Sequence, residues 1–89
     1  MTLAMVVEIP VCRKILLFLL HNSKAIDTAR GIAEWWIQED LHVTQNALDH
    51  LVEVGVVWVH TRGGMNFYSL TRDLKLQRSL RQMLSQAAE

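Results

Sequence analysis

The sequence lacks most features that mark secreted or membrane-spanning chains. Its single cysteine, Cys12, cannot form an internal disulfide, and we expect a buried, reduced thiol as in cytoplasmic proteins. The longest fully apolar run, Ile15 to Leu20, is far shorter than the ~20 residues that span a bilayer, and no signal-peptide cleavage pattern follows it. With one proline and four glycines, the chain has no Pro/Ser-rich linker. We therefore expect a cytoplasmic chain without a membrane segment.

An excess of charge of either sign is also missing. Nine basic side chains balance nine acidic ones, so no overall positive field draws the chain to nucleic acid. What is present is apolar: 51% of the 89 residues are hydrophobic, which favours a packed core over disorder. We expect one domain over residues 1–89, with its core at about 10–71 and a C-terminal helix at about 72–87.

Residues 40–70 carry the clearest pattern. Asp40 is placed to cap the N-terminus of a long helix, and Gly55 stands where a helix usually stops. Two stretches rich in β-branched and aromatic residues, Val56–Thr61 and Asn66–Leu70, flank the turn Arg62–Met65 and predict a β-hairpin. One stripe of the helix has the spacing of a buried face, at Leu41, Thr44, Leu48 and Leu51.

Shorter signals precede this unit. Pro10 suits the first turn of a helix that should run to His21 or Asn22. Because the middle of that helix is apolar all round, more than one of its faces must be covered. Residues 1–9 could form an extended arm or an extra helical turn, and Lys24–Ile26 could add an edge strand to the hairpin.

A second helix is predicted from Thr28 to about Ile37, with Asp27 as its N-cap. We expect Trp35 to be half exposed. Trp58 and the other two tryptophans are interpreted as core or interface residues rather than a base-stacking surface, because they lack basic neighbours in the sequence. The inward face of the helix should consist of Ile32, Ala33 and Trp36.

A last helix should follow Thr71, which is placed as its cap. Its basic residues fall mostly outside an apolar stripe. Excess apolar surface on this helix and on the helix that begins at Pro10 predicts a homodimer built by the two. The stripe consists of Leu76, Leu80, Met83 and Leu84.

A short helix, a turn, a long helix and a glycine hairpin in this order resemble the winged helix-turn-helix of small prokaryotic transcriptional regulators of the ArsR and MarR kind. The similarity covers about residues 10–72 and implies an α+β fold with a three-helix core, a β-hairpin wing and a C-terminal helix. The residues that carry it are Ile32, Ala33, Trp36, Asp40, Thr44, Ala47, Leu48, Leu51, Val52, Glu53, Gly55, Val56, Val57, Arg62, Gly63, Gly64, Phe67, Tyr68, Ser69 and Leu70.

The resemblance implies a small DNA-binding regulator whose 40–54 helix enters the major groove of double-stranded DNA. Gln and Asn side chains can form bidentate hydrogen bonds to adenine there. A histidine one turn further along could reach a phosphate, and the arginine at the hairpin turn could touch phosphate or enter the minor groove. The alternative is that these are ordinary solvated residues. The candidates are His42, Gln45, Asn46, Asp49, His50, Arg62 and Asn66.

Several features depart from the family pattern. The turn before Asp40 is slightly longer than usual, and the paired-cysteine metal site of the ArsR sensors has no match. Residues 27–54 carry six acidic side chains and one basic one, Arg30, a net charge of −5. Since affinity for nucleic acid rests largely on neutralising phosphates, DNA binding would depend on Lys24, Arg62 and the last helix, and would be weak and salt-sensitive or need a dimer. The alternative function is protein–protein contact within a larger assembly, without DNA.

No metal, cofactor or enzymatic activity is expected. His42 and His50 are too far apart in sequence for one helical turn, and no cysteine or carboxylate completes a set of ligands with His21 or His60. Gly63-Gly64 is not a phosphate-binding loop because no helix follows it, and no nucleophile–base pair is evident.

Overall fold

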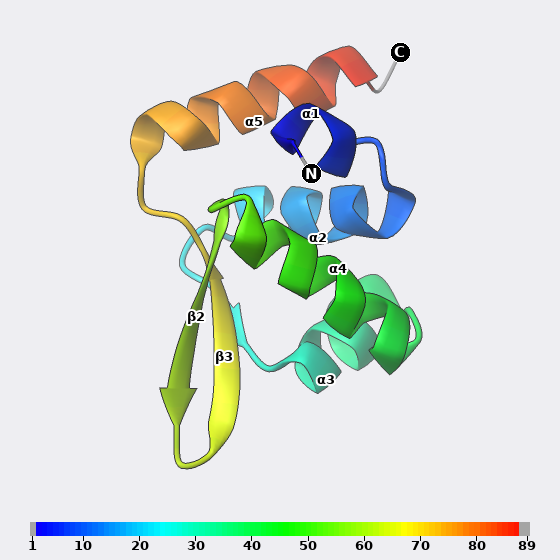
Figure 1. Ribbon diagram of the computed structural model, residues 1–89, viewed down its shortest axis with the longest axis vertical. Helices are drawn as coiled ribbons and strands as arrows, with labels where there is room; N and C mark the ends of the chain where they lie inside the picture. The colour runs from blue at the N-terminus through cyan, green and yellow to red at the C-terminus, as the bar shows by residue number, and fades with distance from the viewer. Residues whose placement is uncertain (1, 88–89) are drawn as a thin grey trace.

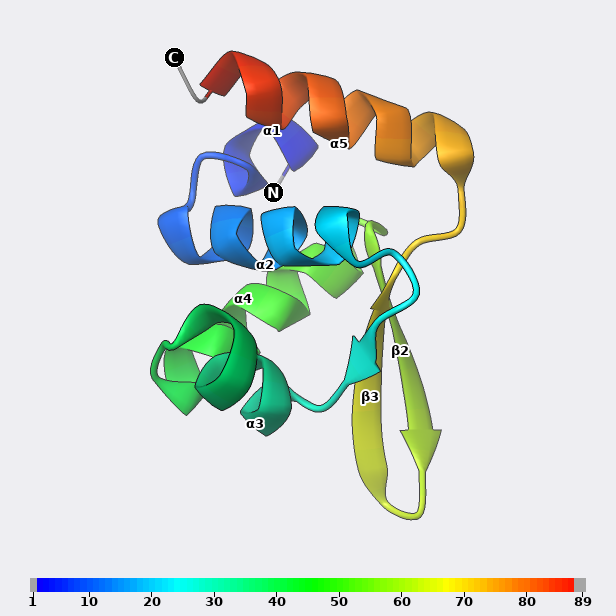
Figure 2. The same cartoon turned by 180° about the vertical axis from the view of Figure 1, so that it is seen from behind.

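The fold is an α+β winged helix-turn-helix. The computed structural model describes residues 2–87, and the side chains of residues 2–85. Figures 1 and 2 show α1 and α5 over α2, α4 on the other side of α2, and the β2–β3 hairpin projecting away from α5. None of the helices within residues 2–87 is both long and apolar enough to cross a membrane. The elements are α1 (Leu3–Val6), α2 (Pro10–His21), β1 (Ile26–Asp27), α3 (Ala29–Gly31), η1 (Ile32–Ile37), α4 (Leu41–Glu53), β2 (Val57–Arg62), β3 (Met65–Leu70) and α5 (Leu74–Ala87).

Helix α2 lies at the centre of the molecule, which explains why its sequence is apolar all round. Ile15, Leu16 and Leu19 are buried, and Leu80 of α5 and Leu48 of α4 belong to the same core. Of the two alternatives for the N-terminal residues, an extended arm or an extra helical turn, the structure has the helical turn. It is α1, a short helix that helps to cover α2 (Figure 1). The apolar faces of α2 are therefore covered largely from within the chain.

The second helix differs from its prediction at its start. Thr28, not Asp27, is the N-cap, because its Oγ1 accepts a hydrogen bond from the Gly31 amide at 3.1 Å. The Asp27 carboxylate instead accepts from the Thr28 amide and from Trp36 Nε1, at 2.7 and 3.1 Å. A Cβ at position 31 would collide with this carboxylate, which explains the glycine there.

The predicted inward position of Trp36 is wrong. After α3 the chain continues as a π-helix, η1, whose turns contain more residues than those of an α-helix. The buried positions are consequently Ile32, Ala33 and Ile37, while Trp36 is 52% exposed and stacks on Phe18 with ring centroids 4.5 Å apart. Trp35 is 78% exposed, more than expected.

The sheet is antiparallel with strand order β1-β3-β2. The predicted edge strand exists, but it is formed by Ile26 and Asp27 rather than by residues 24–26. Helix α5 also begins later than expected, since its cap is Asp73, whose Oδ1 accepts from the Lys75 and Leu76 amides. Thr71 is not the cap; it is buried, and its Oγ1 accepts from the Asp73 amide.

Candidate nucleic-acid interface

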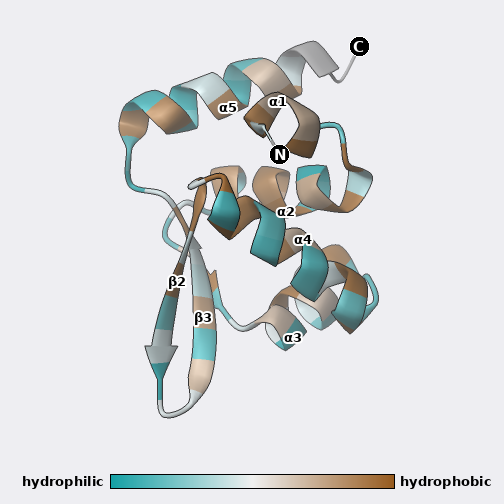
Figure 3. Cartoon of the chain, in the orientation of Figure 1, coloured by the Kyte–Doolittle hydropathy of each residue, from teal (hydrophilic) through white to brown (hydrophobic). Residues whose placement is uncertain are grey.

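Helix α4 is positioned by its ends and by one buried stripe, as predicted. Asp40 Oδ2 accepts from the Val43 amide at 3.0 Å, and Gly55 has a φ of +86° just after the helix ends. Leu48 and Leu51 are fully buried in the core. Figure 3 shows polar residues along the solvent-facing side of α4. This side carries the candidate residues: His42, Asn46 and Asp49 are exposed, and Gln45 and His50 are half-buried.

Gln45 is not the free base-reading side chain that the sequence predicts. Its Nε2 donates to Asp49 Oδ1 at 3.0 Å and to the hydroxyl of Tyr68 on β3 at 2.9 Å. A bidentate contact with adenine needs that amide nitrogen as a donor, so it is not available in this conformation. Gln45 instead joins α4 to the wing.

The wing tip is the tight turn that the two glycines predict. Gly63 and Gly64 have φ angles of +55° and +78°, as a two-residue turn of type I′ requires, and Arg62 pairs with Met65 across it. Thr61 Oγ1 donates to Asn66 Oδ1 at 2.7 Å. The hairpin therefore has a defined register up to its tip.

Register decides which side of the sheet each wing residue occupies. Tyr68 faces α4, so its same-side neighbours Asn66 and Thr61 do as well, because side chains alternate along a strand. Arg62 lies on the opposite side, where it lines a hollow with His60 and Phe67. The side chain of Arg62 therefore does not lie on the side of the hairpin that faces α4.

The acidic residues of the helix-turn-helix are mostly engaged within the protein. Glu39 pairs with Lys14 at 2.9 Å and Glu34 with Arg30 at 3.1 Å. Asp27, Asp40 and Asp49 each accept the hydrogen bonds described above. Arg30 is already counted in the net charge of −5, so only Lys14, which lies outside residues 27–54, offsets one further negative charge and leaves most of the expected repulsion.

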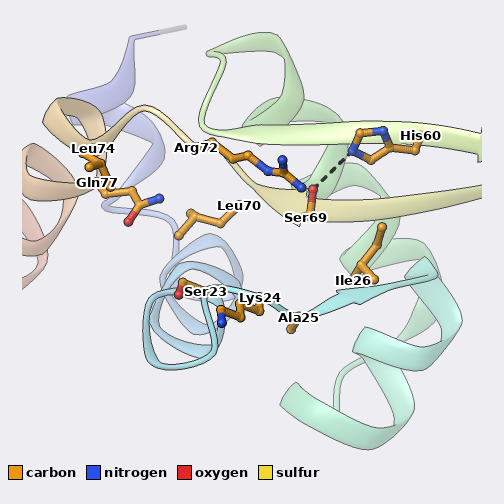
Figure 4. A pocket seen from close by; sticks show the side chains of 10 residues that line it. All are labelled: Ser23, Lys24, Ala25, Ile26, His60, Ser69, Leu70, Arg72, Leu74 and Gln77. Carbon is orange, nitrogen blue, oxygen red and sulfur yellow. Dashed lines mark hydrogen bonds between the residues drawn. The ribbon is translucent and has the colours of Figure 1, made fainter.

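The opposite side of the sheet, here called the outer side, was not recognised in the sequence as a surface of its own. Figure 4 shows how Arg72 extends over β3 toward Ser69 and His60, with Lys24 and Ile26 nearby. By alternation Trp58 belongs to this side, opposite Ser69, and it is 40% exposed. Trp58 therefore shares this side of the sheet with His60 and Arg62 of its own strand. The outer side consists of Ile26, Trp58, His60, Arg62, Met65, Phe67 and Ser69.

Cys12 is buried beneath α4, with its Sγ 3.9 Å from the Ala47 carbonyl oxygen. Burial raises the pKa of this thiol, because desolvation disfavours the thiolate. Within residues 2–87, no three His, Cys, Asp or Glu side chains lie where they could hold one metal ion. The thiol is a packing group in this position.

Comparisons with known proteins identify the fold and no family. No family model and no curated protein sequence matches the chain. A solved structure of Sso10a-2, a DNA-binding protein from Sulfolobus solfataricus, matches with a TM-score of 0.58 and 24% identity, over 84% of this chain and 85% of that one. Human N-acetylserotonin methyltransferase, solved in complex with SAM, matches with a TM-score of 0.63 and 26% identity over 78% of this chain. The chain spans 19% of the length of that methyltransferase. The chain thus shares the winged helix-turn-helix fold with a DNA-binding protein.

Proposed function

We propose that the protein is a small DNA-binding transcriptional regulator of the cytoplasm, similar to the ArsR and MarR regulators. The observation that supports this most is the exposed N-terminal half of α4, held beside a well-formed wing. Sso10a-2, which has the same fold, is described as a DNA-binding protein. In this proposal α4 enters the major groove, as the second helix of a helix-turn-helix does.

The candidate residues then divide by position. Asn46 and His42 are exposed on the first turns of α4 and contact base edges, and His50 contacts a phosphate. Gln45 holds the wing against α4 through Tyr68. Asn66 faces the duplex from the wing, and Arg62 reaches phosphate or the minor groove from the other side of the hairpin tip.

Charge makes this binding weak and strongly dependent on salt. Asp49 is exposed on the same face as Asn46 and opposes the approach of phosphates. Asp49→Lys should therefore strengthen binding to mixed-sequence duplex DNA. Arg62→Ala should weaken it for all sequences and lower the salt slope by about one, the loss of one phosphate contact.

Fluorescence anisotropy with labelled duplex fragments over a salt series measures both effects. The matched control for Arg62→Ala is Arg30→Ala, which also removes one positive charge but lies on α3, paired with Glu34. If the wild type binds no duplex at low salt and Asp49→Lys creates no binding, the proposal fails.

A second candidate function is docking of a protein partner against α4. It is favoured by the remaining negative charge of the helix-turn-helix and by apolar exposure next to it, with Val43 45% exposed and Trp35 78% exposed. In that case Asp49→Lys weakens capture of a basic partner rather than creating affinity for DNA.

We also propose that the protein acts as a homodimer through α2 and α5. Leu17 is 39% exposed, and it lines a hollow of about 250 Å³ together with Leu20 and Leu84. Leu17→Glu should therefore convert a dimer into a monomer in light scattering, with circular dichroism as the check on folding. Leu74→Glu, at a leucine on α5 outside that hollow, is the control and should leave the mass unchanged. A wild-type monomer at micromolar concentration would contradict the dimer.

A further inference from the structure

The surface is hollowed on the outer side of the sheet and at the turn into α5. Two adjoining hollows, of about 500 and about 280 Å³, both contain Ile26, His60 and Arg72 in their walls. We call them together the outer groove, and Figure 4 shows the residues of the larger hollow. Apart from Leu70, its strand residues lie on the side of the sheet opposite to Tyr68, which faces α4. A ligand here therefore leaves α4 open and shares Arg62 with the proposed duplex contact.

The cations of the outer groove have no carboxylate partner among residues 2–85. Lys24 lines the larger hollow, Arg62 the smaller one, and Arg72 both. The ion pairs within the described residues involve Lys14 and Arg30 instead. Asp73, next to Arg72, uses one carboxylate oxygen to cap α5. The groove therefore presents uncompensated positive charge, which favours an anionic ligand.

The floor of the groove is apolar and partly aromatic. Ile26 is 56% exposed and Phe67 is half-buried beside it, while Trp58 lies in the same row of the sheet as Ile26, across Ser69. A flat apolar surface next to guanidinium groups is suited to a ring system that carries a negative charge. Aromatic side chains along a basic groove are how proteins hold the bases of nucleic-acid strands.

We propose that the outer groove binds a nucleotide unit, with its phosphate against Arg72 and its base against Ile26 and Phe67. The chemistry is the same whether the unit is a free nucleotide or part of a single strand. This site is separate from the proposed duplex contact of α4 and does not rest on it.

Calorimetric titration with thymidine monophosphate, thymidine and inorganic phosphate tests the site. The monophosphate should bind, and each of its halves should bind more weakly. In ¹H–¹⁵N spectra, the amides of Ile26, His60, Phe67 and Arg72 should shift while those of Asn46 and Asp49 do not. Arg72→Ala should lower the affinity about tenfold, the loss of a charge-assisted contact.

Lys75→Ala is the matched control, because Lys75 is an exposed cation on α5 that does not line the groove. Its affinity should equal that of the wild type. A short single-stranded oligothymidine distinguishes the two sources of the ligand. Much tighter, steeply salt-dependent binding than the mononucleotide identifies a strand, and similar affinity identifies a free nucleotide.

Three results would overturn the site. They are the absence of binding by both the mononucleotide and the oligonucleotide, an equal loss in Lys75→Ala and Arg72→Ala, and spectral shifts on α4 instead of the sheet. Arg62 belongs to both proposals, so the two are distinguished by Asp49→Lys, which reports on α4 alone, and by Arg72→Ala and the amide shifts, which report on the groove.

Discussion

The two sides of the wing are formed by the same strands but have different surroundings. On the side that faces α4, Tyr68, Leu70 and Val57 are almost completely buried, and the Tyr68 hydroxyl accepts a hydrogen bond from Gln45. On the outer side, His60 and Arg62 are exposed, and the polar bond there, between Ser69 and His60, is long at 3.4 Å.

Acidic and basic residues are also distributed unequally between the two sides of the sheet. Residues 27–54, which include α4, carry a net charge of −5 and pack on the side of the sheet that holds Tyr68, here called the inner side. Lys24, Arg62 and Arg72 lie around the outer side instead. Because side chains alternate along a strand, a shift of register by one residue would exchange the two surfaces. Register therefore decides which ligand each surface can meet, although the composition of the strands stays the same.

The largest expected effect contrasts a leucine beneath the inner side with one at the outer groove. Leu48→Ala should lower the free energy of unfolding by ~2–5 kcal/mol, because it empties a fully buried site. Leu74→Ala, at a residue 72% exposed, should change it by less than ~0.5 kcal/mol. Urea denaturation measures both, and equal losses would show that the stripe of α4 is not the core of this domain.

The next prediction compares the amide side chains of two neighbouring residues on α4. Asn46→Ala should reduce discrimination between DNA sequences by ~1–3 kcal/mol, the range for a bidentate base contact. Gln45→Ala should leave that discrimination unchanged and destabilise the fold, because its amide bonds Tyr68 and Asp49. Selection from a random duplex pool, followed by binding to the enriched sites, is the measurement. The reverse outcome would mean that Gln45 leaves the wing when DNA binds.

The smallest effect compares one hydroxyl on each side of β3. Tyr68→Phe should cost ~0.5–1.5 kcal/mol of stability, since it removes a partly buried hydrogen bond. Ser69→Ala should cost close to nothing, because its bond to His60 is long and exposed. Thermal unfolding of the two variants measures the difference. A larger loss in Ser69→Ala would reverse the assignment of the inner and outer sides.

Much of the fold could be predicted because its signals are local. Asp40 and Gly55 mark the ends of α4, the two glycines require the turn at the wing tip, and Pro10 opens α2. Each of these depends on backbone geometry within a few residues. The caps at Asp27 and Thr71 were wrong by one or two positions, where a second polar residue nearby competes for the same amides.

The sequence by itself determined the winged helix-turn-helix, since helical period, strand alternation and turn chemistry act over short distances. Only the tertiary structure decided the outward position of Trp36, the engagement of Gln45 by Tyr68 and the side of the wing that carries Arg62. The outer groove depends on it as well, because Ile26 of β1 and His60 of β2 come together there only when both strands pair with β3. Contacts between distant segments depend on register and on the widened turn of η1, and neither follows from local residue preferences.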